Sequence, residues 1–177
     1  MLPQVVTLLP IGDVDMGLVQ AVAAALEGAF PVSVRTGNAS PLPRRGWDNT
    51  RRQYLASWVL AEVTVPRDTR DRALGVVDVD LYAPGLNFVF GLAEPNGRRA
   101  LISLARLRQG FYGLPEDEDL LRERALKEAV HELGHTYGLG HCPKPTCVMH
   151  FSNSLGDTDV KHWTFCSRCQ TAIAPHK

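Results

Sequence analysis

The residues best able to do chemistry in this chain are three histidines and a glutamate in its C-terminal third. His131, Glu132 and His135 form the motif His-Glu-Leu-Gly-His, and His141 follows after Gly138. Two histidines four residues apart on a helix project from one face, so both imidazoles can bind one metal ion. Gly138 allows the chain to leave the helix and bring His141 to the same ion. The composition of the chain would produce this extended pattern by chance only about 10⁻⁵ times.

Three neutral imidazoles with an open fourth position are typical of a catalytic zinc site. Zinc held in this way keeps its positive charge, lowers the pKa of a bound water to about 7 and polarises a carbonyl group. Glu132 lies about 100° round the helix from His131, which suits a general base better than a ligand. The motif therefore predicts zinc-dependent hydrolysis of peptide bonds. A purely structural three-histidine zinc is the alternative, although structural sites usually have four protein ligands.

All four cysteines of the chain follow the histidines, at Cys142, Cys147, Cys166 and Cys169. Loops of four and two residues within the pairs let both thiolates of each pair reach one tetrahedral ion, which predicts a structural Cys₄ zinc. Two disulfides or a redox-active Cys-x-x-Cys pair are the alternatives. Because Cys142 follows His141 directly, a metal ion here would also order the C-terminal segment and support the catalytic ligand. The cofactor prediction is thus two Zn²⁺ per chain, one catalytic and one structural.

The pattern from His131 to His141 is similar to the extended zinc-binding motif of metzincin peptidases. Met149 resembles the methionine of their Met-turn, which lies beneath the catalytic zinc without binding it. The cysteine pairs on either side of Met149 resemble those of the archaemetzincin branch, so the chain is identified as a member of the archaemetzincin family over residues 131–169. Some metzincins carry a tyrosine ligand two residues after the methionine, and Phe151 excludes this feature here.

This resemblance implies a fold of mixed α/β or α+β class. The expected sheet is open, twisted and mostly parallel with one antiparallel edge strand, and helices pack against it. A long active-site helix and an irregular C-terminal part held by the second zinc complete the expected domain. The resemblance also implies a peptide or protein substrate, and aminopeptidase activity is attributed to some relatives. A zinc-dependent peptide-binding protein without proteolytic turnover is the alternative function.

The apolar pattern indicates which elements position the motif. An amphipathic helix is predicted at 16–30, and a second at 50–62 with Asp48 as its N-cap. The predicted strands are short and rich in apolar residues and span 4–11, 32–34, 73–81, 86–93 and 100–107. Asn96-Gly97 makes the last two strands a hairpin.

The longest predicted helix opens at Pro115 among acidic residues that suit the positive end of its dipole, and it ends near Tyr137. It carries the histidine motif in its last turns. Beyond it, a helix is predicted only near 167–172. We expect one domain over residues 1–177, with an upper part at 1–138 and a lower part at 139–177.

Bulk composition limits the classes of partner and the compartment. The chain has 177 residues, 19 basic against 19 acidic and 45% hydrophobic, which is typical of one globular domain. Zero net charge argues against a nucleic-acid partner, although basic and aromatic residues flank the cysteines. The N-terminus lacks the pattern of a secretory signal, and no apolar stretch approaches a membrane span. The sequence thus predicts a cytoplasmic monomer, in which cysteines favour metal binding over disulfides.

Overall fold

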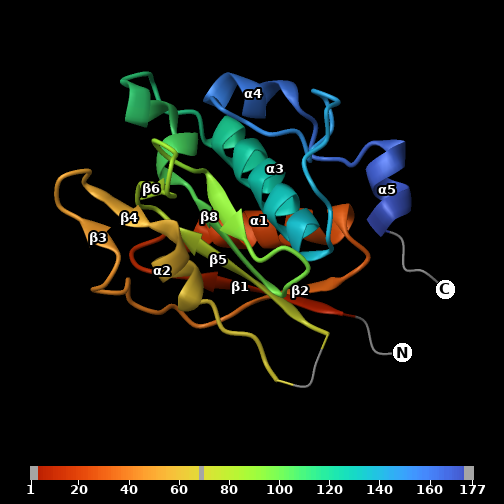
Figure 1. Cartoon of the computed structure of the whole chain (residues 1–177), viewed down its shortest axis with the longest axis horizontal. Helices are drawn as coiled ribbons and strands as arrows, with labels where there is room; N and C mark the ends of the chain where they lie inside the picture. The colour runs from red at the N-terminus through yellow and green to blue at the C-terminus, as the bar shows by residue number, and fades with distance from the viewer. Residues whose placement is uncertain (1–3, 68–69, 174–177) are drawn as a thin grey trace.

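A five-stranded twisted sheet forms the centre of the molecule in the computed structural model, which describes residues 4–67 and 70–173 (Figure 1). Its strands in spatial order are β2 (Ser33–Thr36), β1 (Val5–Pro10), β5 (Arg72–Val77), β8 (Arg99–Ser103) and β7 (Gly91–Ala93). The first four strands pair in parallel, and β7 pairs with β8 in the antiparallel sense. The expected mostly parallel sheet with one antiparallel edge strand is confirmed.

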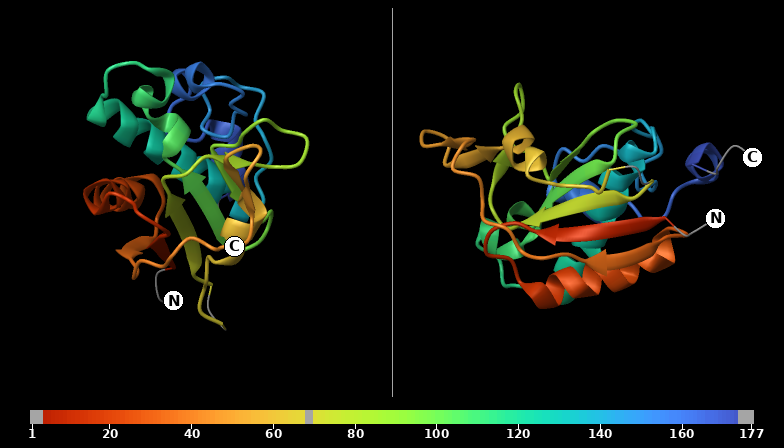
Figure 2. Two further views of the ribbon diagram at one scale, coloured as in Figure 1. Left: turned by 90° about the vertical axis from the view of Figure 1, so that its left-hand side faces the viewer. Right: turned by 90° about the horizontal axis from the view of Figure 1, so that it is seen from below.

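Helices cover both faces of this sheet, and both faces are therefore apolar (Figure 2). The long helices α1 (Met16–Ala29) and α3 (Glu118–Thr136) pack on one face, and α2 (Ala56–Ala61) packs on the other. Successive residues of β8 alternate between the two cores, with Ile102 in the α1–α3 core and Leu101 in the α2 core. This double burial explains why the strands read as continuous apolar runs in the sequence.

Aspartates set the starts of the two long helices. Asp15 accepts a hydrogen bond from the backbone N–H of Gly17 at 2.8 Å, and Asp117 accepts one from Leu120 N–H at 2.9 Å. The long helix therefore begins after Asp117, and the expectation that Pro115 occupies its first turn is wrong by a few residues. The side-chain carboxylate of Asp117 satisfies an otherwise unpaired N–H, which Pro115 cannot do.

The predicted helix at 50–62 is wrong over its first half. Asp48 accepts hydrogen bonds from the N–H groups of Thr50 and Arg51, but it closes a turn in which Arg52 has a φ of 56°. The strands on either side of this turn belong to a small sheet of β3 (Trp47–Asp48), β4 (Gln53–Leu55) and β6 (Leu81–Tyr82). Gln53 is buried and donates to Asp80 and to the carbonyl of Asn87, so tertiary contacts override the local helical pattern.

Short helices complete the chain. Two 3₁₀ turns, η1 (Ala105–Leu107) and η2 (Gln109–Tyr112), end the strand that was expected to run to residue 107. The helix expected near 167–172 is α5 (Ser167–Ile173). Sequence reasoning missed α4 (Leu155–Val160), although its capping box of Ser154 and Asp157 is visible in the sequence. Among the described residues, none of the helices combines the length and apolar character needed to cross a membrane.

Candidate active site

The last turns of α3 direct two imidazoles toward one point. His131 is 4% exposed, and its Nδ1 lies 2.7 Å from the carbonyl oxygen of Val148. His135 Nδ1 lies 2.7 Å from the carbonyl oxygen of Leu139. With each Nδ1–H donating to a carbonyl, both Nε2 lone pairs are free to bind a metal ion. Burial lowers the pKa of both imidazoles, which favours the neutral form that a metal ion requires.

The turn after α3 brings His141 to the other two histidines. Gly138 has a φ of +87° and donates its N–H to the carbonyl of His135, so the helix ends in a left-handed residue. A Cβ at this position would lie 2.3 Å from Oδ1 of Asn96, so a side chain here would displace the Asn96 amide and strain the left-handed backbone. The ligand nitrogens of the three histidines all lie within 4.8 Å of one another.

The spacing of these nitrogens fits zinc. His131 Nε2 and His135 Nε2 are 3.1 Å apart. Two nitrogens bound to one tetrahedral zinc at about 2.0–2.1 Å are about 3.3 Å apart. Three imidazoles leave one tetrahedral position free on the side of the cleft, as in a catalytic site. Phe151 packs against the third imidazole, with 4.9 Å between its ring centre and that of His141.

Glu132 lies beside the triad at the edge of the cleft. The carboxylate lines a cavity of about 440 Å³ together with the three histidines, Phe88 of the β6–β7 loop and Phe151 of the segment after α3. Its side chain is 6% exposed. Burial and the nearby carboxylate of Glu128 raise the pKa of Glu132 well above its usual value, and the positive charge of Lys161 opposes this rise.

Gly91 of the edge strand keeps the space that Glu132 occupies. A Cβ built on Gly91 would lie 2.7 Å from both Cγ and Oε1 of Glu132 and 2.6 Å from the carbonyl oxygen of Leu101. A larger residue at 91 must therefore displace the carboxylate or the strand pairing. Sequence reasoning did not identify Gly91, because its importance depends on a helix more than thirty residues further along the chain.

We expect Gly91→Ala to lower kcat by about 10²-fold, the usual cost of misplacing a reacting group by about 1 Å. Steady-state kinetics on a fluorogenic peptide would measure this loss, and elemental analysis would show an unchanged zinc content. The matched control is Gly28→Ala in α1, where an added Cβ meets no atom within 4 Å. Equal activity of the two variants would show that Gly91 does not position Glu132.

Met149 lies directly beneath the active-site helix. It is fully buried, and a Cβ on Gly134 would lie 2.5 Å from its sulfur. The carbonyl of Met149 accepts a hydrogen bond from Cys142 N–H at 2.8 Å, which ties the methionine turn to the residue after His141. Met149 thus packs its thioether against α3 at Gly134, as a side chain that fills a core gap would.

The four cysteines form a second compact cluster. Their sulfurs all lie within 4.8 Å of one another, and all four thiols are free of disulfide bonds. Cys142 Sγ and Cys166 Sγ are 3.8 Å apart. Two sulfurs bound to one tetrahedral zinc at about 2.3 Å are separated by about 3.8 Å, whereas a disulfide requires about 2.05 Å. A hydrogen bond from the backbone of Cys169 lowers the pKa of Cys166 to about 6, so this thiol ionises readily.

The chain is similar to known proteins in both sequence and structure. A family model described as peptidase family M54 matches residues 49–174. An archaemetzincin of Pyrococcus abyssi is 47% identical over 93% of this chain and 91% of its own length. An archaemetzincin of Thermococcus kodakarensis is 41% identical over 96% of this chain and 95% of its own length.

Solved structures agree with these relatives. An archaemetzincin from Archaeoglobus fulgidus, complexed with malonate, superposes with a TM-score of 0.85 at 38% identity and covers 96% of this chain and 99% of its own. A zinc-dependent peptidase from Methanocorpusculum labreanum superposes with a TM-score of 0.86 at 32% identity. The match covers 95% of this chain and 99% of that peptidase.

The mixed sheet, the edge strand and the open histidine triad define a zinc metallopeptidase. The donor groups of the triad suit the zinc that such enzymes use. Within that class, the chain belongs to peptidase family M54, the archaemetzincins.

Proposed function

We propose that the chain hydrolyses peptide bonds at the histidine triad, with Glu132 as general base. The observation that carries this proposal is the position of a buried carboxylate beside three converging imidazoles in an open cleft. Zinc held by these imidazoles supplies Lewis acidity, which polarises the substrate carbonyl and makes water a stronger acid. Glu132 accepts a proton from the attacking water and returns it to the leaving amine.

The residues that surround the base support this assignment. Gly91 and the sheet hold the Glu132 side chain on one side, and Met149 supports the helix from below. Val148 and Leu139 fix the rings of two histidines through their carbonyl groups. A base held in one position loses little entropy when it reacts, and this favours turnover over simple peptide binding.

We further propose that the chain binds two zinc ions, the second at the four cysteines. The sulfur spacing and the ionisable Cys166 support a structural Cys₄ site. The backbone link from Cys142 to Met149 would transmit the rigidity of this site to Met149, which packs against the active-site helix. In this proposal residues 1–138 and 139–177 are the upper and lower parts of one domain.

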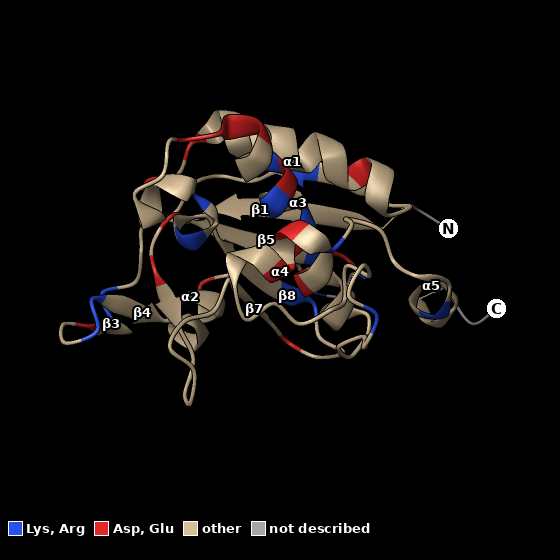
Figure 3. Ribbon diagram, turned by 90° about the horizontal axis from the view of Figure 1, so that it is seen from above, with Lys and Arg blue, Asp and Glu red and all other residues tan. Residues whose placement is uncertain are grey.

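The proposal also covers the substrate, the oligomeric state and the cellular location of the protein. Peptides or proteins are the substrates of the family, and aminopeptidase activity, a monomeric state and a cytoplasmic location are the finer expectations. Acidic and basic residues are interspersed along the elements, which supports the absence of a polyanion partner (Figure 3). Comparing cleavage of free and N-acetylated peptides would separate an aminopeptidase from an endopeptidase.

Removal of zinc is the direct test of the proposed function. We expect a zinc chelator to lower cleavage of a broad peptide library by at least about 100-fold, because the residual protein lacks its Lewis acid. Adding back zinc should restore cleavage. Cleavage that persists in protein shown to be metal-free would contradict the proposal. Zinc-dependent retention of peptides without any cleavage would support the peptide-binding alternative.

A further inference from the structure

The cleft is lined by aromatic and aliphatic side chains together with polar ones, and one of the polar ones is a second buried carboxylate. Glu128 lies on α3 one turn before Glu132, lines the same cavity, and its side chain is only 4% exposed. The lining of the cavity also includes Phe88 and Phe90 of the β6–β7 loop. A buried carboxylate in such a pocket has a specific cause, because an unpaired charge there is strongly destabilising.

Lys161 supplies the opposite charge from behind this carboxylate. Its side chain is fully buried, and Nζ lies 2.9 Å from Glu128 Oε1. The contact is an ion pair without the alignment of a hydrogen bond, and Nζ has no aligned acceptor among the described residues. Thr158 donates to the same carboxylate oxygen at 3.3 Å. The pair thus has no net charge and presents its negative end to the cavity.

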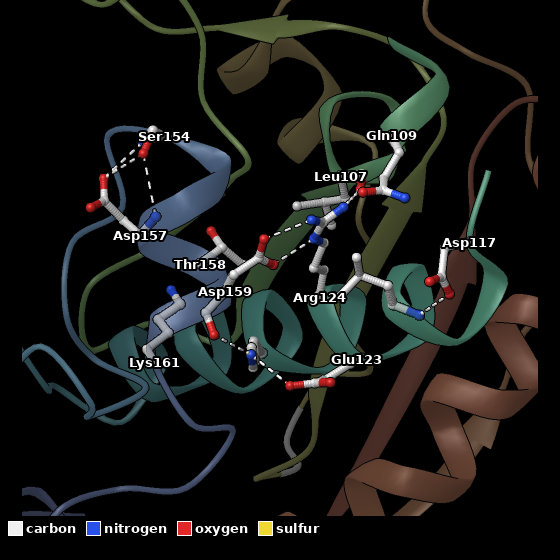
Figure 4. A network of polar contacts seen from close by, with 12 residues as sticks. Leu107, Gln109, Asp117, Glu123, Arg124, Ser154, Asp157, Thr158, Asp159 and Lys161 are labelled. Carbon is white, nitrogen blue, oxygen red and sulfur yellow. Dashed lines mark hydrogen bonds and ion pairs between the residues drawn. The ribbon is translucent and has the colours of Figure 1, made fainter. Parts of the chain in front are cut away.

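A network of polar contacts joins α3 to α4, the helix that precedes Lys161 (Figure 4). Arg124 forms two hydrogen bonds with the carboxylate of Asp159, at 2.6 and 2.7 Å. Lys127 donates to the Asp159 carbonyl at 3.1 Å and pairs with Glu123. Because Lys161 follows α4 directly, these contacts hold its backbone against the active-site helix. A charge pair held this rigidly can discriminate between substrates.

Ser152 adds a hydroxyl group to the lining of the cavity. Its hydroxyl oxygen is buried and has no hydrogen-bond partner among the described residues. Buried hydroxyls are normally paired, so a free one in a substrate cleft is suited to a ligand. A carboxylate accepts hydrogen bonds, whereas a hydroxyl can also donate one.

We propose that Glu128, Lys161 and Ser152 make this pocket selective for an uncharged amide side chain, glutamine or asparagine, next to the scissile bond. The amide N–H₂ would donate to Glu128, and the amide oxygen would accept from Ser152. A cationic side chain would bring an unbalanced charge into the cavity, because Lys161 already neutralises Glu128. An anionic side chain meets the negative end of the pair. An apolar side chain leaves both groups unpaired, which is costly. This inference rests on the proposed function, because it assumes that peptides bind in this cleft.

Four peptides that differ only at this position provide the test. They carry glutamine, glutamate, lysine or norleucine, and kcat/KM is measured with the zinc-loaded protein. Dissociation constants are measured in parallel with zinc-loaded Glu132→Gln protein. We expect the glutamine peptide to be favoured by about tenfold or more over the other three in both measurements.

Charge-removing variants give the sharper result. Lys161→Met leaves Glu128 unbalanced, so the preference should move to the lysine peptide. Glu128→Gln leaves the charge of Lys161 unbalanced, so the preference should move to the glutamate peptide. The matched control is Lys127→Met, which removes another buried lysine of the same network outside the cavity lining. This control should keep the glutamine preference.

Each outcome bears on one proposal. If no peptide is cleaved but the glutamine peptide binds most tightly, the proposed catalysis fails and the pocket assignment stands. If peptides are cleaved or bound without regard to this side chain, the pocket assignment is overturned. If the single variants do not fold, the pocket assignment is tested with the unaltered protein and with the double variant Glu128→Gln/Lys161→Met. The test is the ranking of the four peptides by each protein. The double variant should lose the glutamine preference.

Discussion

Glu132→Ala is expected to lower kcat/KM for peptide cleavage by about 10³-fold while leaving the zinc content unchanged. General bases contribute about 10²–10⁴-fold to enzymatic rates. Glu132 is the carboxylate next to the triad, and Gly91 of the edge strand provides the space that its side chain occupies. The three imidazoles are fixed by other contacts, through the carbonyls of Val148 and Leu139 for two of them. Loss of the base should therefore not release the metal ion.

The experiment combines kinetics with elemental analysis of the same samples. Glu132→Gln serves as the isosteric variant, since it keeps the shape of the side chain but cannot accept the proton. Glu123→Ala is the control, because Glu123 lies on the same helix but is half-exposed and pairs only with Lys127 among the contacts described for it. The assignment of Glu132 as the base fails if the zinc-loaded Glu132→Ala protein retains peptidase activity close to that of the control.

The features predictable from the sequence are those encoded locally. Helical spacing placed His131 and His135 on one face, and Gly138 indicated the turn that brings His141 back. Asn96-Gly97 indicated the hairpin that forms the edge strand, where Asn96 adopts a φ of 56°. Each of these signals depends on residues close together in the chain, so no tertiary contact was needed to interpret it.

The features missed by sequence reasoning depend on contacts between distant segments. Gln53 folds into a strand because its side chain binds Asp80 and Asn87, and nothing local distinguishes it from a helical residue. Lys161 is one of the basic residues that flank the cysteines in the sequence, yet its side chain is fully buried against Glu128. The position of Glu128, three residues before His131, was the one available signal that a second acid faces the cleft. Its partner could not be found without the fold.

A large effect is also expected when one of the four cysteines is replaced. Cys166→Ser is expected to reduce bound zinc from about two ions per chain to about one, because three ligands rarely hold a structural zinc. Cys166 follows Phe165, whose ring contacts that of Phe30 with 5.5 Å between the ring centres. It precedes the helix α5, which carries Cys169. Loss of this ligand should therefore loosen the segment that follows the active-site helix.

The effect should also reach the histidine site. Val148 accepts a hydrogen bond from His131 and donates its own N–H to the carbonyl of Thr164, next to the second cysteine pair. When the cysteines no longer hold this segment, the ring of His131 loses its fixed orientation. Loss of such an outer contact typically costs about 10–100-fold in metal affinity. We thus expect weaker binding of the remaining zinc and a Tm lower by about 10 °C, as for the loss of about 4 kcal/mol in a chain of this size.

Elemental analysis, a zinc titration and thermal unfolding of Cys166→Ser would measure these three effects. Gln170→Ala is the matched control, since Gln170 lies in α5 between the same elements with its side chain in solvent. Hydrogen exchange should increase over residues 142–166 in the cysteine variant and remain unchanged in the control. Retention of two zinc ions by Cys166→Ser, or one zinc ion in the unaltered protein, would be incompatible with a Cys₄ site. A loss of zinc at the cysteines without any change at the histidines would instead show that the two sites are independent, and that contacts such as the one from Cys142 to Met149 suffice to hold Met149 against the active-site helix.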